Sequence, residues 1–522
     1  MTEVVDTVQA DDSGISKKGL TEGSVGVLGA VVIGLSCCAP AYTLTAALGP
    51  AASEVGTQLP AIFIVGFIPM FLVAMGYRAL NKAMPDSGTS FTWATRAFGP
   101  WIGWMGGWGL IAATVLVLSN LAGIAVEFLY LALSQIFQNP EIADWGKIVW
   151  VNILTCLSFM AIATWISYRG MTSTKAFQYV IVAFQMLILV WFIVAAFTGA
   201  YGGSNPDSIP VQLSWFNPFE VSSFSAFSAG IAVSIFVYWG WDTVLTMNEE
   251  TKESKGKSST SGKAATILIF LLVGFYVAIG TATVAFAGVG DGATGLGNAD
   301  IADNVFAALA HPVMGSAGIL LALAVLASSA ASLQSTAVSP ARTLLAMGHY
   351  KALPAKYATI SPRYTSPSYA IFVSAIVASA FYAVMRVVSE NVLWDTITAL
   401  GMMVCFYYGI TAFACVWYFR REAFTSAKAF FLKILMPGLG GIFLFITFIQ
   451  TAIDSMDPEF GSGSAITFGS GPDAYQLGLV FVLGVGVLLL GVVVMFIMRW
   501  RYPAFFRGEI LKQGTPLLTI DE

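Results

Sequence analysis

The first long apolar segment of the chain, residues 25–48, is interrupted at its centre by Gly34-Leu35-Ser36-Cys37-Cys38-Ala39-Pro40-Ala41-Tyr42. Pro40 has no N–H and would clash with the carbonyl four residues earlier, but it fits the first turn of a new helix. The stretch therefore predicts two half-helices that meet near Pro40. Backbone groups freed at bilayer depth are tolerated only where they line a protein cavity, so the break indicates a ligand site. The alternative is a proline kink whose free groups are satisfied by a neighbouring helix.

The composition is that of a polytopic membrane protein. Of the 522 residues, 57% are hydrophobic and 10% are charged, whereas about a quarter are charged in soluble domains. The mean hydropathy is +0.77. The net charge is −4 and the basic residues are dispersed, so no nucleic-acid partner is indicated. The five cysteines have neither CxxC nor Cys/His spacing, and we expect no metal, no disulfide and no cofactor.

Windows of about 20 residues predict about twelve apolar spans, all helical because a barrel would show short alternating strands. They lie near residues 25–49, 59–80, 102–133, 147–168, 176–199, 224–247, 264–289, 314–340, 368–388, 393–419, 429–452 and 476–499. Nearly all cationic residues fall in alternate loops on one side, and only Lys147 and Arg386 fall on the other. The positive-inside rule then predicts a multi-pass protein of the cell membrane with both termini cytoplasmic.

A second break is expected in the sixth span, at Phe236-Val237-Tyr238-Trp239-Gly240-Trp241-Asp242. Gly240 permits backbone angles that other residues avoid, and Asp242 is suited either to cap a fresh half-helix or to contact a ligand directly. Breaks in corresponding spans of two five-helix halves are typical of inverted-repeat transporters with a central site. The halves would be residues 23–199 (spans 1–5) and 200–420 (spans 6–10). Two further spans occupy 421–502, between cytoplasmic tails at 1–22 and 503–522.

Three motifs resemble those of the amino acid–polyamine–organocation (APC) permeases. The first, between the second and third spans, is Met84-Pro85-Asp86-Ser87-Gly88-Thr89-Ser90-Phe91, and it continues to Gly103. The second, after the eighth span, is Ser339-Pro340-Ala341-Arg342. The third is the break in the sixth span together with the pair Glu249-Glu250. Two features differ from the family pattern. A Lys/Ser-rich run, 252–263, replaces an Asn-Pro loop, and the first break lacks the usual Gly-rich tetrapeptide.

The resemblance implies a LeuT-like fold, an all-α 5+5 inverted repeat with helices 1 and 6 broken. By position, a substrate carboxylate would meet the N–H groups of Ala39, Ala41 and Tyr42, near the positive end of the half-helix. An ammonium group would meet carbonyls of Ser36, Cys37 and Cys38 and of Phe236, Val237 and Tyr238. Trp239 and Trp241 are candidates for a lid over the substrate, or for simple packing.

Four further polar residues are candidates for a coupling ion. Glu127 lies late in the third span, as an exposed vestibule carboxylate or a buried proton relay. Ser328 and Ser329 are either ion ligands or serines bonded back to the helix carbonyl four residues earlier. Gln185 stands where some relatives carry a lysine whose ammonium takes the place of a sodium ion, and it cannot titrate. A sodium site needs about six oxygens, and Ala327 stands where a second hydroxyl beside Ser328 would be wanted, so the site lacks one ligand unless the Gln185 amide oxygen supplies it. We therefore expect sodium-independent transport driven by protons or exchange. His311 and His349 are expected in loops on opposite sides.

These observations favour a secondary active transporter of an amino acid or related amine that alternates access to a central site. A polyamine or γ-aminobutyrate transporter, or an amino acid exchanger of the same fold, is the alternative. A membrane-embedded enzyme would need a convergent base and nucleophile, or metal ligands, at membrane depth, and none is visible. A channel would need a ring of repeated filter residues rather than two unlike breaks. The expected partners are a small-molecule substrate and the lipid bilayer.

Overall fold

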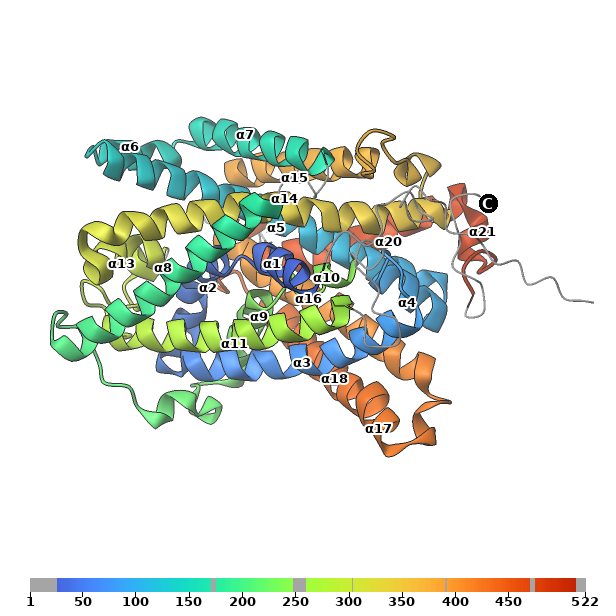
Figure 1. The fold of residues 1–522 in the computed structure, drawn as a ribbon, viewed down its shortest axis with the longest axis horizontal. Coiled ribbons are helices and arrows are strands. Elements are labelled where there is room, and N and C mark those ends of the chain that lie inside the picture. The colour runs from blue at the N-terminus through green and yellow to red at the C-terminus, as the bar shows by residue number, and fades with distance from the viewer. Residues whose placement is uncertain are drawn as a thin grey trace, which may run out of the picture.

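In the computed structural model, the described residues are 26–169, 175–246, 260–302, 304–389, 392–469 and 475–512. The expected N-terminal tail 1–22, the Glu249–Glu250 pair and most of the 252–263 run lie outside them. Long helices run alongside one another through the molecule, with α1, α10 and α16 drawn near the middle of the bundle (Figure 1). The chain is therefore a helical bundle, as its composition predicts.

Ten α-helices lie in the described part of the chain before residue 250. They are α1 (Val27–Cys38), α2 (Pro40–Val55), α3 (Leu59–Ala83), α4 (Ser90–Phe98), α5 (Pro100–Ile136), α6 (Glu141–Asp144), α7 (Val149–Tyr168), α8 (Lys175–Gly202), α9 (Phe224–Val237) and α10 (Thr243–Thr246). Proline stands in the first turn of α2, α3 and α5, where its missing N–H costs no helical hydrogen bond.

The second part of the chain adds further helices and one small antiparallel sheet. Its elements are α11 (Thr260–Ala287), α12 (Ala299–Ala302), α13 (Val305–Met314), α14 (Gly318–His349), α15 (Ser368–Val388), α16 (Val392–Phe419), α17 (Ala427–Phe430), α18 (Met436–Asp454), β1 (Ala465–Phe468), β2 (Tyr475–Gly478), α19 (Leu479–Phe481), α20 (Val487–Arg501) and α21 (Pro503–Phe506). Short π-helical segments, Phe431–Leu435 and Val482–Gly486, lead into α18 and α20.

Within the described ranges, ten helical segments are long and apolar enough to cross a membrane. One of them, Val27–Ala83, comprises α1, α2 and α3, and α9 is a shorter apolar helix. The all-α polytopic class is confirmed, while the count of twelve spans stays a prediction.

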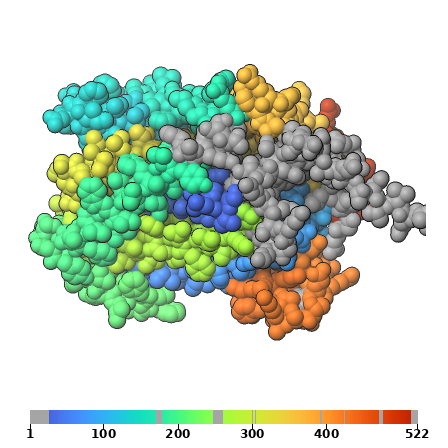
Figure 2. Space-filling model, in the orientation of Figure 1, coloured from blue at the N-terminus to red at the C-terminus, as the bar shows by residue number. Residues whose placement is uncertain are grey.

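Helices from both predicted halves enclose the broken segments. α1 contacts α8, α10, α11 and α14, and α2 packs on α9. Figure 2 shows the blue surface of α1 between those of α8 and α11. Residues 30–52 of α1 and α2 are all buried, and so are residues 228–245 around the second break, so both breaks lie in the interior.

Several expected boundaries were wrong. The eighth span was expected to end at Pro340, but α14 continues to His349 because the residues beyond Pro340 pack into an apolar cluster with Phe91 and Trp104. His349 is thus helical, and His311 lies in α13 rather than in a loop. The segment between the second and third spans contains a helix, α4, which ends at Gly99 (φ 95°).

Candidate functional site

The first helix break lies at Ala39, between α1 and α2. Ala39 has φ 45° and ψ 66°, the left-handed region that residues with a Cβ seldom adopt. Its N–H closes the last turn of α1 on the Leu35 carbonyl at 2.8 Å, and its carbonyl accepts the Thr43 N–H at 2.9 Å. The two half-helices expected here are confirmed. The N–H of Ala39 was expected to meet a substrate carboxylate, but here it donates to the Leu35 carbonyl.

The second break separates α9 from α10. The chain turns at Gly240, whose φ is 100°, and α10 begins at Thr243 directly after Asp242. Within the turn, the Trp239 N–H donates to the Phe236 carbonyl at 2.8 Å, so this carbonyl already has a partner. The break expected in the sixth span is confirmed.

The two breaks touch each other. A Cβ built on Gly240 would lie 3.4 Å from the carbonyl carbon and 3.4 Å from the next nitrogen of the Cys37–Cys38 peptide. The Cys37 Sγ atom lies 3.1 Å from Thr243 Oγ1, at the start of α10. A residue without a side chain therefore stands where the backbone of one break approaches the other.

Helix α14 supports this contact from a third side. Ser332 Oγ donates to the Cys37 carbonyl at 3.0 Å, and Thr336 Oγ1 lies 3.4 Å from Cys37 Sγ. Neither residue was expected from the sequence. Ser328, Ser332 and Thr336 are spaced four residues apart, so they share one face of a helix, and that periodicity was the signal available.

Several backbone groups at the breaks remain unsatisfied. Within the described part of the chain, no group accepts a hydrogen bond from the N–H of Ala41 or Tyr42. Likewise, no described donor reaches the carbonyl of Ser36, Val237 or Tyr238. The Cys38 carbonyl accepts from Thr43 Oγ1 instead. Free donors on one break and free acceptors on both are what a small polar ligand would need.

Asp242 carries a carboxylate into this interior. It is 4% exposed, and no Lys, Arg or His among the described residues forms an ion pair with it. The hydroxyl groups of Tyr407 and Tyr408 and the N–H of Thr243 lie beside the carboxylate, although the Tyr408 hydroxyl has no hydrogen-bond partner among the described residues. A carboxylate at membrane depth without a cationic partner must be neutralised by a proton or a cation.

The two tryptophans of the second break have different surroundings. Trp239 donates from Nε1 to the Tyr407 hydroxyl at 2.6 Å. Trp241 is fully buried against Tyr77 and Tyr408, with ring centroids 5.2 and 5.7 Å away, and its Nε1 has no described partner. The Asp242 side of the break is thus surrounded by aromatic rings.

The two tyrosines expected at the site point to neighbouring helices. Tyr238 donates to the Phe63 carbonyl of α3 at 2.8 Å, so its side chain contributes to packing. Tyr42 donates to Asn120 Oδ1 of α5 at 2.8 Å and lies edge-on to Phe236. Both side chains connect the breaks to the surrounding bundle.

The residues proposed for a coupling ion do not form one hydrogen-bonded set. Gln185, Ser328 and Ser329 are buried, and neither the Gln185 amide nor either serine hydroxyl has a hydrogen-bond partner among the described residues. Back-bonding of these serines along α14 was therefore a wrong expectation. Glu127 is half-buried and accepts from Asn304 Nδ2 at 3.1 Å.

No group of three or more His, Cys, Asp or Glu residues within the described segments could hold a metal ion. All five cysteines are buried and unpaired.

These features define a multi-pass membrane protein with a buried polar site between broken helices. The model of the amino acid permease family matches residues 26–469. The chain therefore belongs to that family, within the APC superfamily.

Individual relatives are distant. The chain is 23% identical to the branched-chain amino acid permease BcaP of Lactococcus lactis, over 42% of this chain and 45% of the relative. It is 22% identical to the low-affinity putrescine importer PlaP of Escherichia coli, over 43% and 46%, and 24% identical to the vacuolar cationic amino acid transporter 4 of Arabidopsis thaliana, over 72% and 61%. The chain spans about half the length of the first two.

Proposed function

We propose that this protein is a secondary active transporter that carries an amino acid, or a related amine, across the cell membrane. The observation that carries the proposal is the buried contact between two helix breaks. Among the described residues, N–H groups of one break have no acceptor and the carboxylate of the other has no cationic partner. Membership of the amino acid permease family supports it. Relatives named as an amino acid permease and as a putrescine importer support the same substrate range.

A substrate carboxylate would bind at the start of α2. The N–H groups of Ala41 and Tyr42 have no described acceptor, and the 16-residue helix directs its positive end toward them. Pro40, the first residue of α2, has no N–H, so the donors at this end are those of Ala41 and Tyr42. This arrangement supports recognition of an anionic group.

The ammonium group would bind on the opposite side of the same site. The free carbonyls of Ser36, Val237 and Tyr238 are acceptors for its N–H groups, and Asp242 supplies the opposite charge. The carbonyls of Cys37, Cys38 and Phe236 already accept from Ser332, Thr43 and Trp239, so each has one lone pair left for the ammonium group. Trp239 would act as the lid, because its indole is held by one hydrogen bond, to Tyr407, that can break on opening.

Access would alternate between two sides by movement of the repeat halves, residues 23–199 and 200–420, with both termini in the cytoplasm. Residues 421–502 would form two additional spans. The contact of α1 with α14 and of α2 with α9 supports a site between these halves.

A polyamine or γ-aminobutyrate transporter, or an exchanger, is the alternative within the same fold. A diamine has no carboxylate and would leave the Ala41 and Tyr42 donors unused, so its affinity would depend on Asp242. An enzyme or a channel is the alternative outside transport, and neither is supported by the family.

Transport would be independent of sodium. A sodium ion needs about six oxygen ligands. Helix α14 offers the Ser328 hydroxyl but carries Ala327 where a second hydroxyl would be needed, so the Gln185 amide oxygen would have to complete the set. Asp242 or Glu127 would then bind the driving proton, unless the protein exchanges one substrate for another.

A two-stage experiment tests the proposal. Purified protein is first screened by thermal shift against amino acids and amines, because a ligand stabilises with the logarithm of its concentration over Kd. Initial uptake of a stabilising ligand into proteoliposomes is then measured with sodium and with choline. We expect saturable uptake that choline leaves unchanged. Non-saturating flux would indicate a channel, product formation without uptake an enzyme, and collapse in choline a sodium-coupled transporter.

A further inference from the structure

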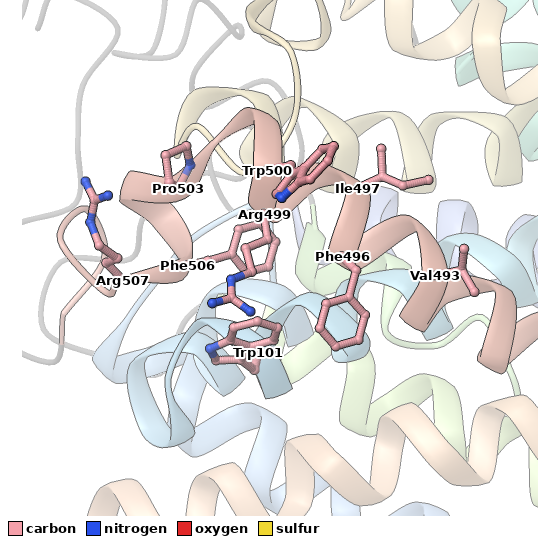
Figure 3. A pocket seen from close by; sticks show the side chains of 9 residues that line it. All are labelled: Trp101, Val493, Phe496, Ile497, Arg499, Trp500, Pro503, Phe506 and Arg507. Atoms are coloured by element: carbon pink, nitrogen blue, oxygen red, sulfur yellow. The ribbon is translucent and has the colours of Figure 1, made fainter.

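A groove of about 1000 Å³ lies where the end of α20 and the short helix α21 meet the start of α5. Its lining includes Arg499 and Arg507 and the rings of Trp101, Phe496, Trp500 and Phe506 (Figure 3). None of these residues belongs to the central site. The groove combines two cationic groups with an aromatic wall, which transport through the helix breaks does not require.

One face of α20 leads from the bilayer into this groove. Its large side chains Leu489, Leu490, Val493, Phe496, Ile497 and Trp500 are each at least 52% exposed. They are spaced so that they form one stripe along a helix. Trp500, at the end of the stripe, is 93% exposed, and tryptophan is enriched where the hydrocarbon meets the headgroups.

The charges at the end of this stripe are predominantly positive. Arg499 and Arg501 are exposed, and neither forms an ion pair within the described residues. The Arg499 guanidinium lies 5.1 Å from the centre of the Trp101 ring, which holds it at the groove (Figure 3). Arg507 is paired with Glu509, at 2.5 Å between Nε and Oε1. The Arg499 guanidinium therefore remains for an anion in the groove. Arg501 does not line the groove, because it lies two residues further along α20, but it adds positive charge at the same helix end.

We infer that the groove binds an anionic phospholipid, with an acyl chain along the α20 stripe and the phosphate at Arg499, while Arg501 adds positive charge at the same end of α20. A guanidinium donates two parallel N–H groups that match phosphate oxygens, and basic pockets beside membrane helices bind anionic headgroups. The apolar stripe explains why the ligand is a lipid rather than free phosphate.

A second copy of the chain fits the same surface less well. A two-fold axis along the membrane normal would bring the same end of α20 from each copy together. Arg499 and Arg501 would then face their own counterparts, while the carboxylate of Glu509 is already paired with Arg507. A lipid phosphate removes this repulsion.

The test measures lipid binding by native mass spectrometry of the purified full chain. Dioleoyl phosphatidylglycerol is titrated against wild type, Arg499→Gln/Arg501→Gln and the matched variant Arg420→Gln/Arg421→Gln. The control also removes two arginines from a helix end, including one whose guanidinium lies 4.0 Å from a tryptophan ring centre. Each arginine near an anionic lipid contributes about fivefold in affinity, so the groove variant should bind about thirtyfold more weakly. The control should stay within about twofold of wild type.

Three comparisons distinguish the sources of binding. Dioleoyl phosphatidylcholine has the same chains without net charge and should bind wild type and the groove variant equally. Glycerol 3-phosphate has the charge without chains and should not compete. Added salt should weaken phosphatidylglycerol binding to wild type, a measurement that needs no variant.

Equal losses in both double variants, equal affinity for the two lipids, or no effect of salt would each overturn the inference. A change in dimer mass without a change in bound lipid would assign the surface to a second copy. If the glutamine variant does not fold, Arg499→Lys/Arg501→Lys keeps the charge and should retain most of the binding.

Discussion

Asp242→Asn should change substrate affinity and stability in opposite directions. Asparagine keeps the shape of the side chain and removes a charge that is 4% exposed and has no cationic partner among the described residues. Removing one member of a buried charge pair costs about 2–5 kcal/mol in binding, so an amine ligand identified by thermal shift should bind at least about thirtyfold more weakly. The empty variant should be as stable as wild type or more stable, because no buried charge then needs neutralising.

Asp395→Asn is the matched control, since Asp395 is also buried in the bundle but is satisfied. The Ser462 hydroxyl lies 2.8 and 2.9 Å from its two carboxylate oxygens and donates one hydrogen bond shared between them. Its loss should destabilise the protein by about 1–3 kcal/mol without changing ligand affinity. Thermal melting and ligand titration of both variants provide the measurement. The reasoning is refuted if Asp242→Asn binds the amine within about threefold of wild type, or melts as early as Asp395→Asn.

Three further outcomes are expected. Trp239→Phe keeps the ring but removes the 2.6 Å hydrogen bond to Tyr407, worth about 1 kcal/mol; half-saturation in uptake should rise about fivefold while the yield of folded protein is unchanged, and equal losses would make Trp239 a packing residue. Gly240→Ala places a Cβ at φ 100° and should cost about 1–3 kcal/mol in unfolding, whereas Gly274→Ala, with nothing within 4 Å of the added Cβ, should be neutral or stabilising in the same melts. In a Cys-free background, Ser204→Cys should react with an impermeant thiol reagent outside cells and Lys356→Cys should not, and the reverse pattern would contradict the predicted orientation.

The sequence alone predicts the membrane class and the positions of both helix breaks. The high hydrophobic content and low charged content of the sequence predict a membrane protein, and this prediction does not depend on how the helices pack. Pro40 and Gly240 act locally, because a missing N–H and a missing Cβ change which backbone angles are accessible within a few residues. Such effects need no knowledge of the rest of the fold.

Local rules were misleading where distant packing outweighed them. Pro340 would end an isolated helix, yet α14 continues for nine residues beyond it because its last turns are buried against Phe91 and Trp104. The Ala39 N–H was expected to be free, but the left-handed turn directs it to Leu35.

Tertiary structure alone decided which groups meet at the site. Cys37 and Thr243 are 206 residues apart and Cys37 and Ser332 are 295 apart, so no local pattern relates them. Their contact depends on how α1, α10 and α14 pack together. Tertiary packing also leaves Asp242 beside aromatic rings and without a cationic partner among the described residues. Proline and glycine could specify where the backbone breaks, because that is a property of a few neighbouring bonds. Whether a freed N–H, carbonyl or carboxylate remains available depends on every helix that surrounds it.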